Sequence, residues 1–141
     1  MDYRFKIRFG DTDAAGIVFY PNYYRWMDEA THEFFNNLGC PTDQLMKEKL
    51  ATPLLEAHCV FKSPGFFNHE IVLTTKVEYI REKVFKLVHC FKDGETVLAE
   101  GYEVRAWVSL EGGLPKSQPI PDEIKEQMQK HLGSVKTSMK N

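Results

Sequence analysis

Residues 9–26 of this chain read FGDTDAAGIVFYPNYYRW. The first half predicts a loop, because glycine, small residues and aspartate favour turns and Asp side chains bond nearby backbone amides. The second half runs through an apolar segment into a helix start at Pro21 or Asn22. A carboxylate beside a helix N-terminus would place a general base or nucleophile next to amides that stabilise an oxyanion. We therefore expect a reaction centre in this segment.

Both flanks of this loop carry regular hydrophobic patterns. Upstream, residues 3–9 alternate apolar and basic side chains, the period of a half-buried strand. Downstream, apolar residues recur at helical spacing over residues 23–38, which predicts one long amphipathic helix that Gly39 ends. Residues 42–50 predict a short second helix. The chain thus begins with a strand, the loop and a long helix.

The second half of the chain changes character after Pro53. Four strand-like segments follow without a long helical pattern between them, and they predict an antiparallel meander. These segments are residues 54–62, 71–80, 84–91 and 96–109. Asp93-Gly94 predicts a type I′ hairpin turn between the last two. Residues 119–122, PIPD, predict the start of a C-terminal helix.

The order of these elements favours one architecture. A single sheet can curl around the long helix and bury its apolar side, which carries Trp26, Phe34 and Leu38. We expect an α+β fold, a long central helix wrapped by a five-stranded antiparallel sheet, as a single domain over residues 1–133 with a frayed tail at 134–141. Such a sheet leaves an edge uncovered, so we also expect a homo-oligomer.

Composition excludes several classes of protein. A formal net charge of −2 and a pI near 6.2 give no general attraction to nucleic acid or anionic membranes, so neither is an expected partner. We see neither a signal peptide nor an apolar run of membrane-spanning length. The three cysteines form no CxxC pair and the five histidines show no metal-ligand spacing. We therefore expect a cytoplasmic protein without a metal site.

Residues 11–23, DTDAAGIVFYPNY, resemble the signature of the 4-hydroxybenzoyl-CoA thioesterase branch of the hotdog-fold acyl-CoA thioesterases. The match is dense over this run. Weaker similarity covers most of the chain, including Thr52-Pro53, residues 61–70, residues 81–85 and Ile120-Pro121. The resemblance implies the hotdog fold, assembly as a homodimer or homotetramer, and an active site at a subunit interface. It also implies no cofactor, since coenzyme A enters as part of the substrate.

The resemblance assigns roles within the loop. The second aspartate of the family's motif is the catalytic carboxylate, which is Asp13 here, acting as nucleophile or as general base. The thioester oxygen lies near the backbone amide of Tyr20, and Gly16 permits close approach. Asp11 is expected to shape the loop instead. The related Tol-Pal-associated branch has a histidine where Pro21-Asn22 stands here, a departure that favours the hydroxybenzoyl branch.

Further substrate contacts follow from the same resemblance. Asp28 matches an acidic position near the aryl hydroxyl, so an aryl substrate is expected. CoA phosphates are met in the family by basic residues of a turn between two later strands, which match Arg81 and Lys83. The match is looser there, since Glu82 stands where a second basic residue is expected. Tyr23, at the start of the long helix, completes the expected substrate-binding residues.

Alternatives remain open at this point. Some hotdog thioesterases carry the carboxylate on the long helix, which makes Glu29, His32 and Glu33 rivals of Asp13, although their spacing fits a solvated face. Cys59 beside His58 suggests a thiol nucleophile, but neighbours on a strand point to opposite faces. The leading hypothesis is an acyl-CoA thioesterase that hydrolyses an acyl or hydroxybenzoyl-type aroyl thioester. The alternatives are an aliphatic acyl-CoA or acyl-carrier-protein thioesterase and a non-catalytic thioester-binding module.

Overall fold

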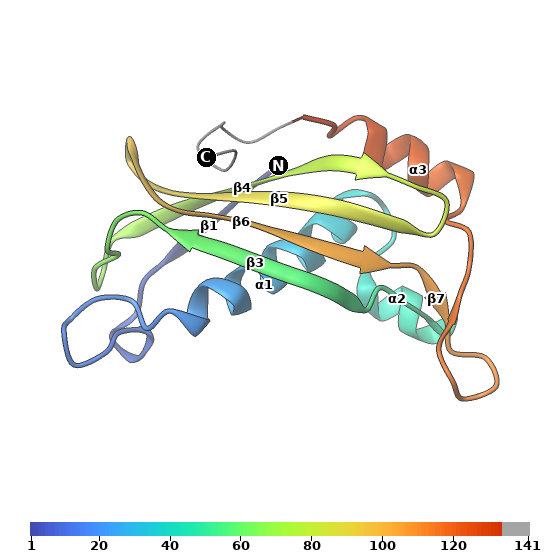
Figure 1. The fold of residues 1–141 in the computed structure, drawn as a ribbon, viewed down its shortest axis with the longest axis horizontal. Coiled ribbons are helices and arrows are strands. Elements are labelled where there is room, and N and C mark those ends of the chain that lie inside the picture. Colours follow the sequence, from blue (N-terminus) through green and yellow to red (C-terminus); the bar gives the residue numbers. More distant parts are fainter. Residues whose placement is uncertain (134–141) are drawn as a thin grey trace.

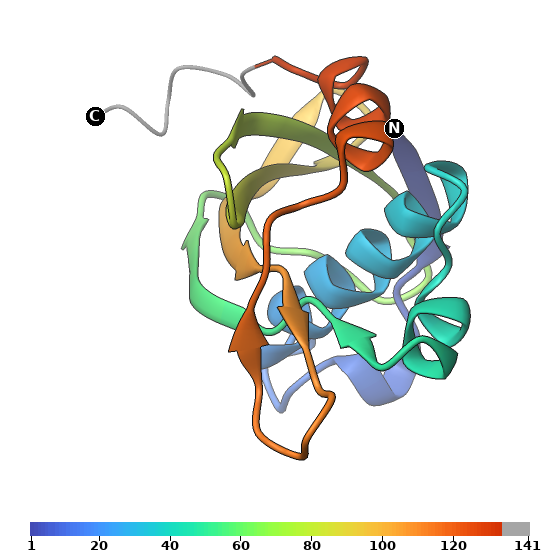
Figure 2. The ribbon, with the colours of Figure 1, turned by 90° about the vertical axis from the view of Figure 1, so that its right-hand side faces the viewer.

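The computed structural model describes residues 1–133 and shows an antiparallel sheet curled around one long helix (Figures 1 and 2). The sheet has five strands in the order β1-β4-β5-β6-β3. They are β1 (Asp2–Lys6), β3 (Leu54–Phe61), β4 (Glu70–Ile80), β5 (Val84–Asp93) and β6 (Thr96–Ala106). The helix α1 (Pro21–Asn37) lies against the inner face. The predicted α+β architecture is confirmed.

The core lies between α1 and the inner face of the sheet. Trp26, Phe34 and Leu38, the side chains expected to be buried, are all buried. Trp26 packs near the start of the helix in one apolar cluster with residues of β1, β4 and β5, and Phe34 belongs to a second cluster nearer the helix end. Met128 of α3 (Asp122–Gln129) is fully buried in the second cluster, so the C-terminal helix closes that end of the core.

Several element ends differ from the predicted ones. β1 stops at Lys6 because the chain bends into a short 3₁₀ helix, η1 (Phe9–Asp11). The second helix, α2 (Thr42–Lys47), ends before Leu50 because Lys49 adopts a φ of 56°, which no α-helix accommodates. The last long strand stops at Ala106 and does not run to residue 109.

A second, three-stranded sheet was not predicted. It consists of β2 (Leu50–Ala51), β7 (Val108–Ser109) and β8 (Lys116–Ser117), in the order β2-β7-β8. Each strand has two residues, which is too short for a hydrophobic period to show. This small sheet extends the β6 end of the molecule beside α2 (Figure 2).

The hairpin between β5 and β6 forms at the predicted place but with a different turn. Asp93 pairs with Thr96, so the loop is Gly94-Glu95, and only Gly94 has a positive φ, of 60°. A type I′ turn needs positive φ at both central residues, and that prediction is wrong; glycine first with a negative φ next fits type II′. The predicted tail over residues 134–141 lies outside the described part of the chain. No helix within residues 1–133 is long and apolar enough to span a bilayer.

Candidate active site

A cavity of about 520 Å³ lies where the loop after β1, the start of α1 and the end of β3 meet. Its lining residues are Asp13, Ile17, Val18, Tyr20, Tyr23, Phe61, Lys62, Ser63, Pro64 and Gly65. Three of the predicted site residues, Asp13, Tyr20 and Tyr23, therefore border one space. The other walls come from the connection between β3 and β4.

Asp11 holds the loop together. Its Oδ2 accepts a hydrogen bond of 2.8 Å from the Arg8 amide, and its Oδ1 lies 2.8 Å from Nη2 of Arg25 on α1. Its backbone carbonyl accepts hydrogen bonds from the Phe19 amide and the Asn22 side chain. The expectation that Asp11 shapes the loop is confirmed, and both of its carboxylate oxygens are used for that purpose.

Asp13 is held differently. One carboxylate oxygen, Oδ1, accepts a 2.8 Å hydrogen bond from the Ala15 amide, and the Asp13 amide donates to the Ile17 carbonyl. Gly16, with a φ of 79°, closes the turn by donating to the Asp13 carbonyl. The side chain is exposed, and within residues 1–133 its Oδ2 has no hydrogen-bond partner. The turn thus fixes a carboxylate whose second oxygen is available for chemistry.

The backbone amide of Tyr20 is also available. Tyr20 is the N-cap residue of α1, and the neighbouring Phe19 and Asn22 amides bond to the Asp11 and Phe19 carbonyls. The Tyr20 amide itself donates to no atom in the described part of the chain. An unpaired N–H at the positive end of a helix is suited to bind a developing negative charge. Asp13 and Tyr20 both line the cavity, and the oxyanion role of the Tyr20 amide stays a prediction.

The walls of the cavity are mostly apolar. The Tyr23 ring packs edge-on against Trp26 and Phe91, and burial raises the pKa of its hydroxyl to about 12, so the phenol keeps its proton. Gly65 accepts a hydrogen bond from the Val18 amide, and a Cβ at this position would lie 2.9 Å from the Val18 side chain. The sequence pattern ended a strand at residue 62, and nothing in that pattern predicted that residues 63–65 line the site.

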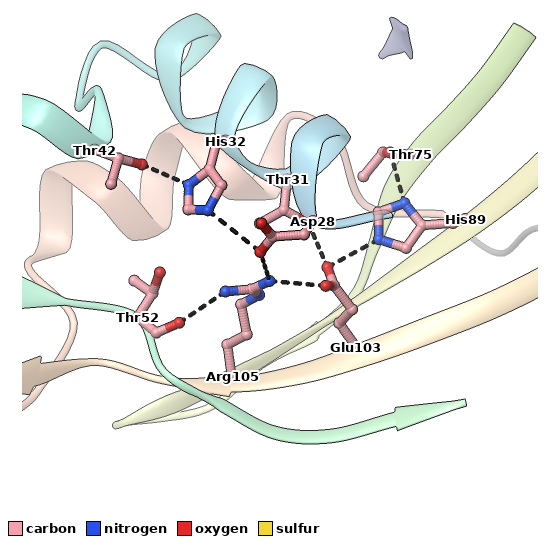
Figure 3. Close-up of polar contacts among 9 residues, drawn as sticks. All are labelled: Asp28, Thr31, His32, Thr42, Thr52, Thr75, His89, Glu103 and Arg105. Carbon is pink, nitrogen blue, oxygen red and sulfur yellow. Dashed lines mark hydrogen bonds and ion pairs between the residues drawn. The ribbon is translucent and has the colours of Figure 1, made fainter. Parts of the chain in front are cut away.

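Asp28 does not line this cavity. It lies further along α1, where its Oδ1 accepts a 2.8 Å hydrogen bond from Nη2 of Arg105 and lies 3.3 Å from Nε2 of His32 (Figure 3). Arg105 and its buried partner Glu103 are both on β6 and were not among the predicted site residues. The predicted contact between Asp28 and a substrate hydroxyl stays a prediction.

Arg81 and Lys83 lie in the turn between β4 and β5, at the end of the sheet opposite the Asp13 loop (Figure 1). The Arg81 guanidinium lies 4.4 Å from the centroid of the Tyr79 ring, a cation–π contact. Among the described residues, neither Arg81 nor Lys83 forms an ion pair, so both charges are free to meet an anion. Within one chain they do not meet Asp13.

The rival nucleophiles are less suited. Glu29 is paired with Arg25 at 3.1 Å and accepts a hydrogen bond from Tyr3, and neither it nor Glu33 lines the cavity. Burial raises the pKa of Cys59 to about 12, so a thiolate is disfavoured at neutral pH. No group of three or more possible metal-ligating side chains occurs within residues 1–133.

Comparison with known proteins gives the family. A model of the thioesterase-like superfamily matches residues 7–128, and the chain belongs to this superfamily. The solved structure of a gentisyl-coenzyme A thioesterase is 42% identical, with a TM-score of 0.84 over 91% of this chain and 99% of that one, which confirms the hotdog fold.

Two relatives known by sequence carry related names. A 4-hydroxybenzoyl-CoA thioesterase of Pseudomonas sp. (strain CBS-3) is 33% identical over 87 residues, 60% of this chain. The match covers 62% of that enzyme, less than two thirds of its length. A 1,4-dihydroxy-2-naphthoyl-CoA hydrolase of Thermosynechococcus vestitus (strain NIES-2133 / IAM M-273 / BP-1) is 29% identical over 129 residues, 87% of this chain and 84% of the relative. All three names refer to CoA thioesters of hydroxylated aromatic acids.

Proposed function

We propose that the protein is an acyl-CoA thioesterase that hydrolyses an aroyl-CoA thioester to the free acid and coenzyme A. The observation that carries this proposal is that Asp13 and Tyr20 line one cavity, and that within residues 1–133 neither Oδ2 of Asp13 nor the Tyr20 amide has a hydrogen-bond partner. The names of the relatives support an aromatic acyl group.

The geometry supports a short reaction sequence. Asp13 either attacks the thioester carbonyl carbon through its free Oδ2 or takes a proton from a water that attacks it. In both cases the C=O π electrons move onto the carbonyl oxygen, and the Tyr20 amide donates to that oxygen. The C=O bond then re-forms, the C–S bond breaks and coenzyme A leaves as the thiolate. On the general-base route the free acid forms directly, and the proton that Asp13 took from water passes to the thiolate. On the nucleophilic route an acyl-Asp13 anhydride forms, and a water then hydrolyses it, which releases the free acid, regenerates the carboxylate and supplies the proton for the thiolate. Coenzyme A arrives as part of the substrate, and the proposal needs no further cofactor and no metal.

The proposed substrate carries a hydroxyl on its acyl group. Asp28 is the proposed acceptor for that hydroxyl, and the buried Tyr23 phenol supplies a wall and a donor near the thioester. An aliphatic acyl group offers no hydroxyl donor to Asp28. A hydrolysis panel of hydroxybenzoyl, benzoyl and aliphatic CoA thioesters, with a thiol-reactive dye to detect released coenzyme A, tests the proposal on wild type and Asp13→Asn. Binding without release of coenzyme A across the panel would favour a non-catalytic module.

We also propose that two copies of the chain form the working unit. The loop between β1 and α1, which carries Asp13, and the β4–β5 turn, which carries Arg81, lie at opposite ends of the sheet (Figure 1), and in the proposed assembly an extended CoA thioester contacts the two places on different subunits. β3 is an edge strand, and Leu54, Leu55 and Phe61 on it are between 46% and 60% exposed. A second copy that pairs along this edge would cover these side chains.

A charged side chain on this edge should weaken the dimer. Leu55→Lys places an ammonium group where the second copy is proposed to pair, and edge lysines oppose strand pairing. Sedimentation at micromolar concentration should show a dimer for wild type and dissociation for the variant. Leu114→Lys, at a leucine that is 80% exposed in a loop, is the matched control and should remain dimeric. A wild-type monomer at micromolar concentration would reject the proposed assembly.

Loss of the two positive charges of the β4–β5 turn, Arg81 and Lys83, should weaken binding of the CoA thioester. Arg81→Ala with Lys83→Ala should raise KM by roughly tenfold with kcat nearly unchanged, because remote phosphate contacts stabilise the bound substrate and the transition state equally. Steady-state kinetics on a CoA thioester measures both constants. The control is Arg4→Ala with Lys6→Ala, which removes the same two charges from exposed positions of β1. An unchanged KM in the Arg81→Ala, Lys83→Ala variant would show that the β4–β5 turn does not bind the substrate.

A further inference from the structure

A cluster of polar side chains is buried between α1 and the sheet (Figure 3). We call it the buried polar cluster; its members are Thr31 of α1, Thr75 of β4, His89 of β5, and Glu103 and Arg105 of β6. All five are buried, and they include the Glu103 carboxylate and the Arg105 guanidinium. The proposed reaction at Asp13 uses none of them. A buried charged cluster costs desolvation free energy, so its purpose requires an explanation.

Glu103 is the centre of this cluster. Its Oε1 accepts hydrogen bonds from the Thr31 hydroxyl and from Nε2 of His89, and its Oε2 lies 2.7 Å from Nη2 of Arg105. The Thr75 hydroxyl bonds the other nitrogen of His89 at 2.8 Å. Burial alone would raise the pKa of Glu103, but the contacts with His89 and Arg105 outweigh it and lower this pKa to about 2. The Glu103 carboxylate therefore supplies a negative charge 2.7 Å from Nη2 of Arg105.

Arg105 is held from three directions. Nη2 contacts Glu103 at 2.7 Å and Asp28 at 2.8 Å, and Nη1 donates to the Thr52 carbonyl at 3.0 Å. Its side chain is 5% exposed. Its Nε is buried and finds no acceptor among the residues that the structure describes, so the two carboxylates and the Thr52 carbonyl alone place the guanidinium. Because the guanidinium is planar and rigid, fixing it also fixes the direction of its remaining N–H bonds.

Asp28 is the exposed end of this chain of contacts. Its side chain is 54% exposed, yet Oδ1 is committed to Arg105 and faces Nε2 of His32, whose Nδ1 is bonded in turn to the Thr42 hydroxyl at 2.7 Å. Within residues 1–133 the other oxygen, Oδ2, has no partner. A cavity of about 190 Å³ is lined by Arg105 and His32, the two side chains that contact Oδ1 of Asp28, although Asp28 itself is not among its lining residues.

We propose that Arg105 is a positioning residue that sets the acyl-group preference of the enzyme. It holds Asp28 by one oxygen, so that the other oxygen keeps one direction and accepts a hydrogen bond from a hydroxyl on the acyl group. The buried polar cluster serves to keep Arg105 in place. This inference rests on the proposed function and on the proposed contact between Asp28 and the substrate hydroxyl, and it adds the residue that makes this contact selective.

The test is a ratio of two efficiencies. kcat/KM is measured for 4-hydroxybenzoyl-CoA and for benzoyl-CoA, and the first should exceed the second in wild type. Arg105→Lys keeps the charge but loses the planar fork, so it should lower this ratio by roughly tenfold, the worth of one hydrogen bond to a charged group. It should leave kcat/KM for benzoyl-CoA nearly unchanged. Asp28→Ala should lower the ratio as much, and Arg105→Lys added to Asp28→Ala should lower it no further.

A control separates positioning from stability. Thr31→Val removes one hydrogen bond to Glu103 without touching the Arg105–Asp28 contact, so it should lower the thermal midpoint and leave the ratio unchanged. An equal loss on both thioesters in Arg105→Lys, or an unchanged ratio, overturns the proposal. So does a wild type that hydrolyses both thioesters equally well, a result that leaves thioesterase activity itself intact.

A binding measurement decides the case if the thioesters are not hydrolysed. Non-hydrolysable thioether analogues of the same two substrates, with and without the para hydroxyl, are titrated by calorimetry. A preference of wild type for the hydroxylated analogue that is lost in Arg105→Lys supports the inference even where the proposed hydrolysis fails. Equal affinities of wild type for the two analogues contradict it.

Discussion

Asp13→Asn should lower kcat by about 10²–10⁴, which corresponds to ~3–5 kcal/mol of activation free energy. Asparagine has the same shape and keeps a side-chain oxygen for the Ala15 amide, so the turn that Asp13 forms should persist. The substitution removes the negative charge on which both proposed roles of Asp13 depend. Coenzyme A release from an aroyl thioester, followed with a thiol-reactive dye, measures the loss.

Two controls make this result specific to Asp13. Asp11→Asn removes the neighbouring carboxylate, which contacts Arg8 and Arg25 and serves the loop, so its effect on kcat should be much smaller. Glu29→Gln tests the rival carboxylate on α1 and should leave kcat near the wild-type value. Turnover close to wild type in Asp13→Asn would reject the assignment, and a large loss in Glu29→Gln alone would transfer the role to the helix.

Glu103→Gln should lower the free energy of unfolding by about 3–5 kcal/mol at neutral pH, because it leaves the buried Arg105 guanidinium without its closest counter-charge. Gln keeps the size of the side chain, so the loss reports charge and hydrogen bonding and not a cavity. Urea unfolding at pH 7, compared with wild type, measures it. Glu78→Gln removes the exposed partner of Lys86 and should cost about 0–1 kcal/mol.

The same variant should change how stability depends on pH. The pKa of Glu103 lies at about 2 in the folded chain against an ordinary 4.5, so its ionisation favours folding by about 3 kcal/mol above pH 4.5. That contribution falls as the pH drops from 4.5 towards 2, where the folded-state carboxylate takes up its proton. The stability difference between wild type and Glu103→Gln should therefore narrow over this interval. A difference that stays constant from pH 7 to pH 3 would show that Glu103 is not ionised in the core.

The sequence predicted the elements that have a clear hydrophobic period. The helical spacing from Tyr23 to Leu38 and the alternation along β1 and β4 were sufficient to predict the long helix and the sheet around it. Asp13 and Tyr20 were assigned through a resemblance of their loop, and the structure brings both to one cavity. Their chemical roles stay predictions.

β6 shows why the polar core was missed. Glu103 and Arg105 alternate with Tyr102 and Val104, a pattern that ordinarily places the charged pair on the solvent face. The structure does the reverse and buries the charged pair against α1. This arrangement is possible because the two charges neutralise each other and because Thr31, His89 and Asp28 supply further hydrogen bonds. These three partners lie far from Glu103 and Arg105 in the sequence and come close to them only in the folded chain.

The cavity walls were missed for a related reason. A Pro-Gly pair indicates that a strand stops, but not which surface the connection then covers. Gly65 approaches Val18 so closely that a side chain would clash, a constraint that exists only once both segments are folded. The two-residue strands of the small sheet likewise carry no pattern of their own.

The loop that carries Asp13 is tied together by its own backbone and by Asp11, whereas Asp28 stands on α1 and takes its orientation from β6. In the proposed enzyme, bond cleavage and acyl selection therefore depend on different side chains, and within residues 1–133 no hydrogen bond or ion pair joins the Asp13 side chain to Asp28 or Arg105. Under this proposal, substitutions along β6 change which acyl group is preferred and leave the Asp13 loop unchanged. A protein with its selectivity and its hydrolysis on separate side chains can change its acyl substrate and still hydrolyse the thioester bond.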